Sequence, residues 1–281
     1  MLKKIVLKPL IRLIVTNKIS WSLINLMIRV SERFKFEKEF VQWQKNESKR
    51  ISGETRLQNL FSDLTVKYGF FKGMKYPEFI AHGSCMYGKL LGSYESELSD
   101  VIEELCKKEY SEIIDVGCAE GYYAIGLAIR IPSAKVYAYD INPEAIKSCM
   151  KMATLNNVKD RLIFNSYCSP ETLSSFNFTK RGLIVCDCEG YEIELFNKTN
   201  INSFGKCDLL IELHDGKNDL ISPTLFNLFK DTHNIKIVRS INCFIKSSGF
   251  KELEGLTTDE LKICLQERTG IMEWAYLTPI V

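Results

Sequence analysis

One stretch, residues 112–130, constrains the fold more than any other. It starts with a short apolar run that ends at Val116, passes through a turn bracketed by Gly117 and Gly121, and continues with apolar residues at helical spacing. This pattern predicts a buried strand, a tight turn and the first turns of a helix. Glycine suits such a turn, because it permits positive φ and because a Cβ would block the approach of a ligand to the backbone. The stretch therefore predicts a ligand-binding crevice.

The composition of this turn restricts the ligand. Ala119 stands where a dinucleotide fingerprint has its second glycine, and no lysine follows Gly121 as a P-loop requires. Asp115 and Glu120 bring carboxylates, which repel a pyrophosphate and attract a cation. S-adenosylmethionine fits, because it carries a sulfonium and an ammonium group.

The spacing of Asp115, Gly117 and Gly121 resembles motif I of the class I, Rossmann-like methyltransferases. The resemblance implies that this loop holds the methionine part of the cofactor. The loop residues we expect at the cofactor are Asp115, Gly117, Cys118, Ala119, Glu120 and Gly121.

The second half of the cofactor site is expected one helix and one strand later. Residues 135–139 predict a short strand, and Asp140 closes it, where an acid accepts hydrogen bonds from ribose hydroxyls in related folds. An aspartate at a strand end is often a helix cap instead, but Asn142 before a proline can serve as that cap. Beside Asp140 we expect Ile141 at the cofactor. The resemblance adds Cys168, in the loop that usually contacts the adenine.

Alternating elements continue to the C-terminus. Strands are predicted at 112–116, 135–139, 161–165, 182–187, 208–214, 235–239 and 271–277, and helices at 96–108 and 143–155. Residues 67–93 are too rich in glycine for a helix and predict a loop lid, and 251–268 predict a solvated helix whose Glu267 and Arg268 approach the cofactor face. The expected fold is α/β: a Rossmann-like, seven-stranded, mostly parallel sheet with helices on both faces, plus an N-terminal helical appendage.

The N-terminal segment differs from the rest of the chain. Residues 1–30 hold six basic residues and no acid, mixed with apolar residues. Lys8, Pro9 and Arg12 interrupt the apolar run, which argues against a signal peptide and against a membrane span. We predict a basic amphipathic helical segment over 1–60 and a methyltransferase domain over 61–281. Residues 1–38 either contact an anionic membrane surface or pack on the catalytic domain or a partner subunit, as in a homo-oligomer.

Global composition excludes some partners. A net charge of +2 gives no sign of nucleic acid, and the ten cysteines lack the paired spacing of disulfide or zinc frameworks. Cys186 and Cys188 form a Cys-x-Cys that favours core thiols over a metal site. Free thiols indicate a reducing compartment, so we expect the protein in the cytoplasm, with the inner face of the membrane as an alternative.

Two strand ends carry the most specific signal. The fourth strand runs into Asp187, Glu189 and Glu192, and the fifth ends with Glu212 and His214. This pair resembles the FkbM-type methyltransferases, as do residues 68–74 and 92–95, although Cys188 replaces a more usual aliphatic residue. The resemblance covers residues 66–278 and implies O-methylation of a carbohydrate or glycolipid-linked acceptor. The residues we expect at this substrate are Tyr94, Glu95, Glu189 and Glu192.

A sugar hydroxyl is a weak acid, so its methylation is helped by a general base or by a metal ion. Asp187, Glu212 and His214 are expected to converge on one crevice, and we favour His214 as the base. The alternative is Mg²⁺ or Mn²⁺ held by Asp187 and Glu212, which resembles the magnesium site of catechol O-methyltransferase.

The sequence is also compatible with two other functions. The chain could be a non-catalytic cofactor-fold module that partners glycan-assembly proteins, although the complete set of Asp115, Gly117, Gly121 and Asp140 argues against a decayed site. It could also methylate protein or nucleic acid. Acids after the fourth strand repel phosphate, and no Asn/Asp-Pro-Pro-Tyr/Phe motif follows that strand, so we expect no nucleic-acid partner.

Overall fold

The structure, a computed structural model, describes residues 55–246, 249–268 and 270–280, together with positions 38, 41, 42 and 53. The chain divides into two compact units, residues 1–56 and 57–281, a division close to the predicted boundary after residue 60. The predicted amphipathic segment and its membrane contact lie almost wholly outside the described residues. Within the described parts, no helix is long and apolar enough to cross a bilayer.

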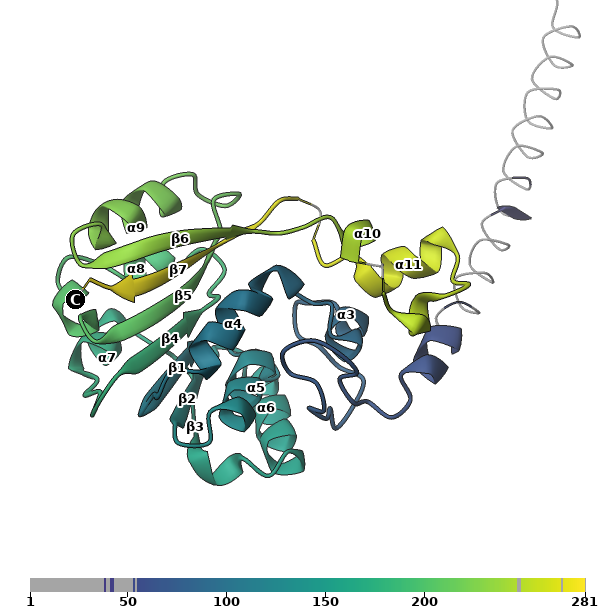
Figure 1. Cartoon of the computed structure of the whole chain (residues 1–281), viewed down its shortest axis with the longest axis horizontal. Helices are drawn as coiled ribbons and strands as arrows, with labels where there is room; N and C mark the ends of the chain where they lie inside the picture. The colour runs from purple at the N-terminus through teal and green to yellow at the C-terminus, as the bar shows by residue number, and fades with distance from the viewer. Residues whose placement is uncertain are drawn as a thin grey trace, which may run out of the picture. The chain divides into compact units, whose positions relative to one another are not determined.

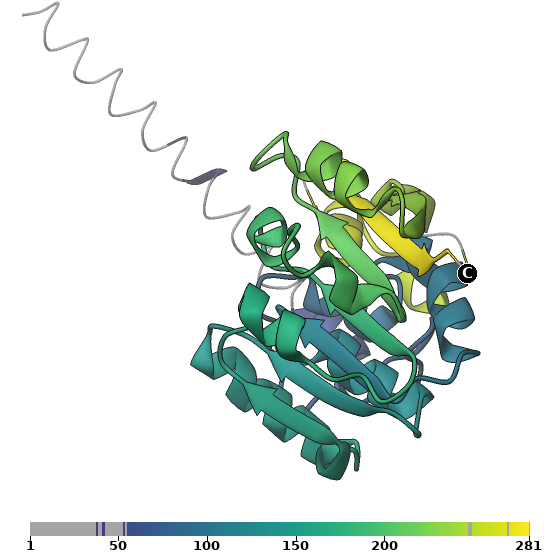
Figure 2. The ribbon, with the colours of Figure 1, turned by 90° about the vertical axis from the view of Figure 1, so that its left-hand side faces the viewer.

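The second unit is built on a seven-stranded sheet with the strand order β3-β2-β1-β4-β5-β7-β6 (Figure 1). Its strands are β1 Glu112–Val116, β2 Lys135–Tyr139, β3 Leu162–Asn165, β4 Gly182–Cys186, β5 Cys207–Leu213, β6 His233–Arg239 and β7 Glu273–Pro279. Only β7 runs antiparallel to its neighbours. Figure 2 shows the teal strands at one edge of the sheet and the green and yellow strands at the other. The predicted Rossmann-like sheet is confirmed, and every predicted strand lies within two residues of its observed bounds.

Helices cover both faces of this sheet (Figure 1). One face carries α4 Ser99–Cys106, α5 Tyr122–Arg130 and α6 Pro143–Leu155; the other carries α7 Pro170–Ser175, α8 Glu192–Leu195 and α9 Ile221–Phe229. Successive strand residues point to opposite faces, so Ile113 joins the core under α5 while Ile114 joins the core under α9. The central strands β1, β4 and β5 are buried on both sides, as their continuous apolar runs predict.

The segment before the sheet differs from the predicted loop lid. It contains a helix, α3 Met86–Leu91, although Gly88 lies in its middle. α3 packs on α11, and a Cβ on Gly88 would lie 3.5 Å from the Cys264 carbonyl oxygen, an ordinary contact distance, so this position does not require glycine. Phe71 is buried, and its ring lies where a Cβ on Gly126 of α5 would stand. This part of the segment is therefore packed on the domain.

Between β6 and β7 the chain forms an insertion, defined here as residues 240–272. It holds α10 Cys243–Lys246, the short η4 Lys251–Leu253 and α11 Thr258–Leu265, so the single long helix predicted over 251–268 is wrong in extent. A reciprocal capping box of Thr257 and Glu260 starts α11. The buried ammonium group of Lys246 lies 2.7 Å from Glu97 and 2.8 Å from Glu267, which ties the insertion to η1 Ser96–Leu98. Figure 1 shows α11 beside α3.

Candidate active site

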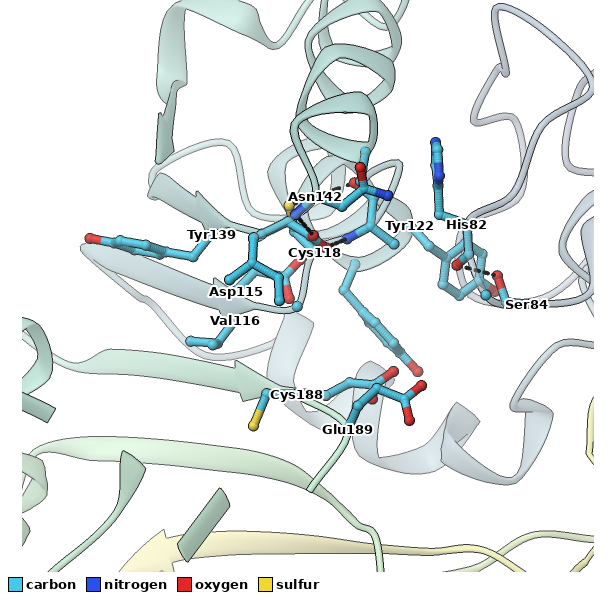
Figure 3. A pocket seen from close by; sticks show the side chains of 18 of the residues that line it. His82, Ser84, Asp115, Val116, Cys118, Tyr122, Tyr139, Asn142, Cys188 and Glu189 are labelled. Carbon is cyan, nitrogen blue, oxygen red and sulfur yellow. Dashed lines mark hydrogen bonds between the residues drawn. The ribbon is translucent and has the colours of Figure 1, made fainter. Parts of the chain in front are cut away.

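A cavity of about 490 Å³ opens at the carboxyl ends of β1, β2 and β4 (Figure 3). Its walls come from the loops that follow β1, β2, β3 and β4, and from residues 82–94. In Figure 3, Cys188 and Glu189 lie on one side of it and Asp115, Cys118 and Asn142 on another. The predicted cofactor residues that line it are Asp115, Gly117, Cys118, Ala119, Asp140, Ile141, Cys168 and Asp187.

The two glycines of the first loop serve contacts within the protein. Gly117 has φ +82°, and a Cβ there would stand 1.7 Å from the Asp187 carbonyl oxygen. Gly121, at φ +104°, would bring a Cβ to 2.7 Å from the Cys149 sulfur, and it does not line the cavity. The loop after β1 is thus pressed against the loop after β4 and against α6. The positive φ expected of these glycines is observed at both, and Gly117 also lines the cavity.

Asp115 presents a carboxyl oxygen without a hydrogen-bond partner to the cavity. Its side chain is buried, and its Oδ2 has no hydrogen-bond partner among the described residues. Burial raises the pKa of Asp115 to about 8, and the nearby Asp187 and Asp140 add to the rise. A buried carboxylate oxygen without a partner is costly, so a cationic ligand group beside it would be strongly favoured.

Asp140 organises the opposite wall. Its Oδ2 accepts a hydrogen bond from the Ala119 N–H at 2.8 Å, and its Oδ1 accepts one from the Asn142 N–H at 2.8 Å. Asn142 caps α6 by accepting the Glu144 N–H at 3.0 Å, the role predicted for it as an alternative to Asp140. Each carboxylate oxygen keeps a second lone pair, so Asp140 can still accept from ligand hydroxyls.

Glu120 does not reach the cavity, which corrects its predicted cofactor role. Its carboxylate pairs with the Lys89 ammonium at 2.5 Å and accepts the His82 N–H at 2.9 Å. Lys89 also lies 4.9 Å from the ring centre of Tyr94, a residue that does line the cavity. The charge of Glu120 is therefore balanced inside the protein and is not available to a ligand.

His214 lies at the end of β5 with one ring nitrogen held by an acid. Its Nδ1 is 2.6 Å from Glu192 Oε1, which also accepts the Gly190 N–H at 3.1 Å. Glu192 is fully buried and does not line the cavity, so its predicted substrate contact is replaced by a contact with His214. Because the carboxylate accepts a hydrogen bond from the Nδ1–H, the neutral imidazole keeps its lone pair on Nε2.

The Nε2 atom of His214 faces three carboxylates. It lies 3.5 Å from Asp187, 3.6 Å from Glu189 and 3.8 Å from Glu212. Asp187 and Glu189 line the cavity, whereas His214 and Glu212 lie behind them and are not among its lining residues. Burial lowers the pKa of His214, but the hydrogen bond to Glu192 and the charges of the surrounding acids raise it by more, so the pKa lies above its ordinary value. Burial raises the pKa of Asp187 to about 6, against the charge of His214.

Glu95 and Glu212 are joined by Arg268 of the insertion. The guanidinium pairs with both buried carboxylates, and Glu95 also accepts the hydroxyl of Tyr123. Burial raises the pKa of Glu95 to about 7 despite the charge of Arg268. Glu95 does not line the cavity, so its predicted substrate contact is also corrected. Arg268 was expected to approach this face, and it does.

The nine cysteines with described side chains are free thiols. The sulfurs of Cys186 and Cys188 are 3.4 Å apart, and Cys188 lies in the cavity wall. Among the described residues, Asp187, Glu212 and His214 form a group whose potential metal-ligand atoms lie within 4.8 Å of one another, as predicted for the first two. The spacing of these three side chains suits a metal ion.

A mostly parallel sheet of this strand order, with a glycine loop after β1 and an acid after β2, defines a Rossmann-like methyltransferase fold. In agreement, residues 107–199 match a family model described as a methyltransferase domain. Residues 107–199 are thus similar to a methyltransferase domain. The FkbM-type subfamily stays a prediction.

Individual proteins match shorter stretches. A release factor glutamine methyltransferase of Dictyoglomus turgidum is 37% identical over 79 residues, which cover 27% of this chain and 28% of that protein. A ribosomal protein L11 methyltransferase of Acinetobacter baylyi is 44% identical over 50 residues, or 18% of this chain and 16% of that protein. The crystal structure of an rRNA methylase from Streptococcus thermophilus aligns with a TM-score of 0.44 at 12% identity, covering 66% of this chain and 97% of that one. The matched stretches thus span less than a third of the length of these curated relatives.

Proposed function

We propose that the protein transfers a methyl group from S-adenosylmethionine to a hydroxyl oxygen of a carbohydrate. The cofactor part is supported by the cavity at β1 and β2. Asp115 offers an unpaired anionic oxygen to the ammonium group of the cofactor, and Asp140 offers lone pairs to its ribose hydroxyls. Ile141 and Cys168 line the same cavity and supply apolar contacts for the adenine.

The pairing of His214 with Glu192 is the observation that carries hydroxyl transfer. The short contact at Nδ1 fixes the tautomer, so Nε2 can accept the proton of an acceptor hydroxyl. S-adenosylmethionine held in the cavity would supply the methyl group from its sulfonium and would be left as a neutral thioether, while His214 Nε2 would hold the proton of the acceptor hydroxyl. Glu192 stabilises the imidazolium that results, as the acid of a catalytic triad does.

The carbohydrate acceptor is supported by the FkbM-type resemblance and by the polar edge of the cavity. Asp187 and Glu189 have side chains that are 31% and 65% exposed, so they can accept hydrogen bonds from sugar hydroxyls. A glycolipid-linked sugar would place this reaction in the cytoplasm at the inner face of the membrane, where the basic residues 1–38 favour contact with anionic lipid.

Protein is the second candidate acceptor, because the curated relatives are named for a release factor and a ribosomal protein. Both names describe methyltransferases that act on a protein. The exposed acids at the cavity edge favour a polyhydroxylated acceptor over a phosphate-bearing one such as nucleic acid.

The test uses the full chain, cofactor with a labelled methyl group, and two acceptor pools: a cell-envelope glycan fraction and a total protein fraction. We expect label in the glycan pool, on an oxygen located by mass spectrometry, and its loss in His214→Ala. Label confined to protein would replace the acceptor by the second candidate. Cofactor binding without transfer to either pool would support the non-catalytic module.

A further inference from the structure

The acids around His214 are each matched by a cation of the protein, with one exception. Glu192 pairs with His214 itself, Glu189 pairs with Lys217, and Glu212 pairs with Arg268. Among the described residues, Asp187 has no closer cationic partner than His214 at 3.5 Å. Lys217 and Arg268 therefore offset part of the negative charge of the group without any added ion, in contrast to a metal site, where several carboxylates are left for a divalent ion to neutralise.

Arg268 is held firmly in this position. Its guanidinium bridges Glu212 at the end of β5 and Glu95 of the segment before η1, and its side chain is only 18% exposed. The neighbouring Glu267 pairs with Lys246 and accepts the Glu95 N–H at 3.2 Å. A guanidinium stays charged at any physiological pH and can donate to two carboxylates at once.

An ion bound by Asp187, Glu212 and His214 would have to share Glu212 with this guanidinium. The two cations would stand within a few ångström of each other in a largely buried site, where repulsion between like charges is screened little. The donor spacing therefore fits a divalent ion, but the charge arrangement does not.

We propose that Arg268 takes the place of a metal ion: it neutralises and positions Glu212 beside His214, and it keeps Mg²⁺ and Mn²⁺ out of the site. Arg268 is a positioning residue that acts through Glu212. The role of Arg268 in methyl transfer rests on the proposed function. Its exclusion of a metal ion does not, because it follows from the arrangement of Arg268, Glu212, Asp187 and His214.

The test measures Mn²⁺ binding by electron paramagnetic resonance on chelator-treated full-length protein. Wild type is expected to show no stoichiometric binding, and Arg268→Ala is expected to bind one ion per chain at least about tenfold more tightly than wild type. Adding Glu212→Gln to Arg268→Ala should abolish that binding. Arg239→Ala is the matched control, because Arg239 is the last residue of β6, directly before the insertion, is 76% exposed and pairs with Glu273; it should behave as wild type.

The inference is overturned if wild type binds one Mn²⁺ that Glu212→Gln removes, or if Arg268→Ala binds no more tightly than wild type. Arg268→Met, which keeps the apolar stem, replaces the alanine variant if circular dichroism shows that the latter is unfolded. Calorimetry with S-adenosylhomocysteine is run on the same samples. Absence of cofactor binding would end the proposed function but leave the Mn²⁺ result to decide this inference separately.

Discussion

Changing Glu192 to glutamine probes the proposed base most sharply. Glutamine is nearly isosteric, but it removes the charge that lies 2.6 Å from His214 Nδ1. A hydrogen bond between charged partners contributes about 1.5–3 kcal/mol, and one pKa unit corresponds to about 1.4 kcal/mol. Losing this bond should therefore lower the pKa of His214 by about one to two units.

The expected kinetic result follows from the sign of that shift. Methyl transfer needs neutral Nε2, so kcat rises as the pH rises through the pKa of His214, which lies above the ordinary histidine value in wild type. In Glu192→Gln this rise should move to lower pH, while the plateau falls by about 10²-fold because the base is weaker and its tautomer is no longer fixed. The affinity for S-adenosylhomocysteine should not change, since Glu192 lies outside the cavity wall.

The assay is a pH profile of kcat with labelled cofactor, together with calorimetry. Glu194→Gln is the matched control, because Glu194 lies on the same helix but is exposed. A Glu192→Gln enzyme with kcat within about twofold of wild type and an unmoved acid limb would refute the pairing of Glu192 with a catalytic His214.

Three further predictions concern the cofactor cavity. Asp140→Ala should raise the dissociation constant of S-adenosylmethionine, measured by calorimetry, by about tenfold to a hundredfold for each ribose hydrogen bond lost. An unchanged affinity would show that Asp140 does not bind the ribose. Gly117→Ala should lower the free energy of unfolding by more than about 1–2 kcal/mol in urea titrations, since positive φ and the Asp187 carbonyl both oppose a Cβ, whereas Gly205→Ala, with nothing within 4 Å, should change it little. Cofactor binding at pH 7 should release close to one proton, because Asp115 with a pKa of about 8 is protonated in the empty cavity and ionised beside an ammonium group; equal binding heats in buffers of different ionisation enthalpy would contradict this.

The elements of the sheet could be predicted well because their signal is local. The central strands β1 and β4 are buried on both faces, so each appears as an apolar run bounded by polar turns, and parallel neighbours bring their carboxyl ends to one edge. This is why Asp115, Asp140 and Asp187 could be assigned to one cavity from strand ends alone.

Pairings between side chains distant in the chain could not be predicted in the same way. Glu120 meets Lys89 and Glu192 meets His214 only after the domain has packed, and neither contact leaves a periodic trace in the sequence. Helix α3 could not be predicted because the glycine count of residues 67–93 argues against a helix, although only one of these glycines, Gly88, lies within α3. Local sequence patterns predict that these acids lie near the ends of the strands. Tertiary packing determines which of them pair with protein cations and which remain available to a ligand.

Direct titration of the wild-type chain with S-adenosylmethionine tests the central claim. Isothermal calorimetry should give one site per chain, with the affinity lost in Asp115→Ala and retained in Arg239→Ala, whose exposed side chain lies outside the cavity. Absence of binding by wild type, or equal affinity of wild type and Asp115→Ala, would contradict the placement of the cofactor in the cavity between β1, β2 and β4.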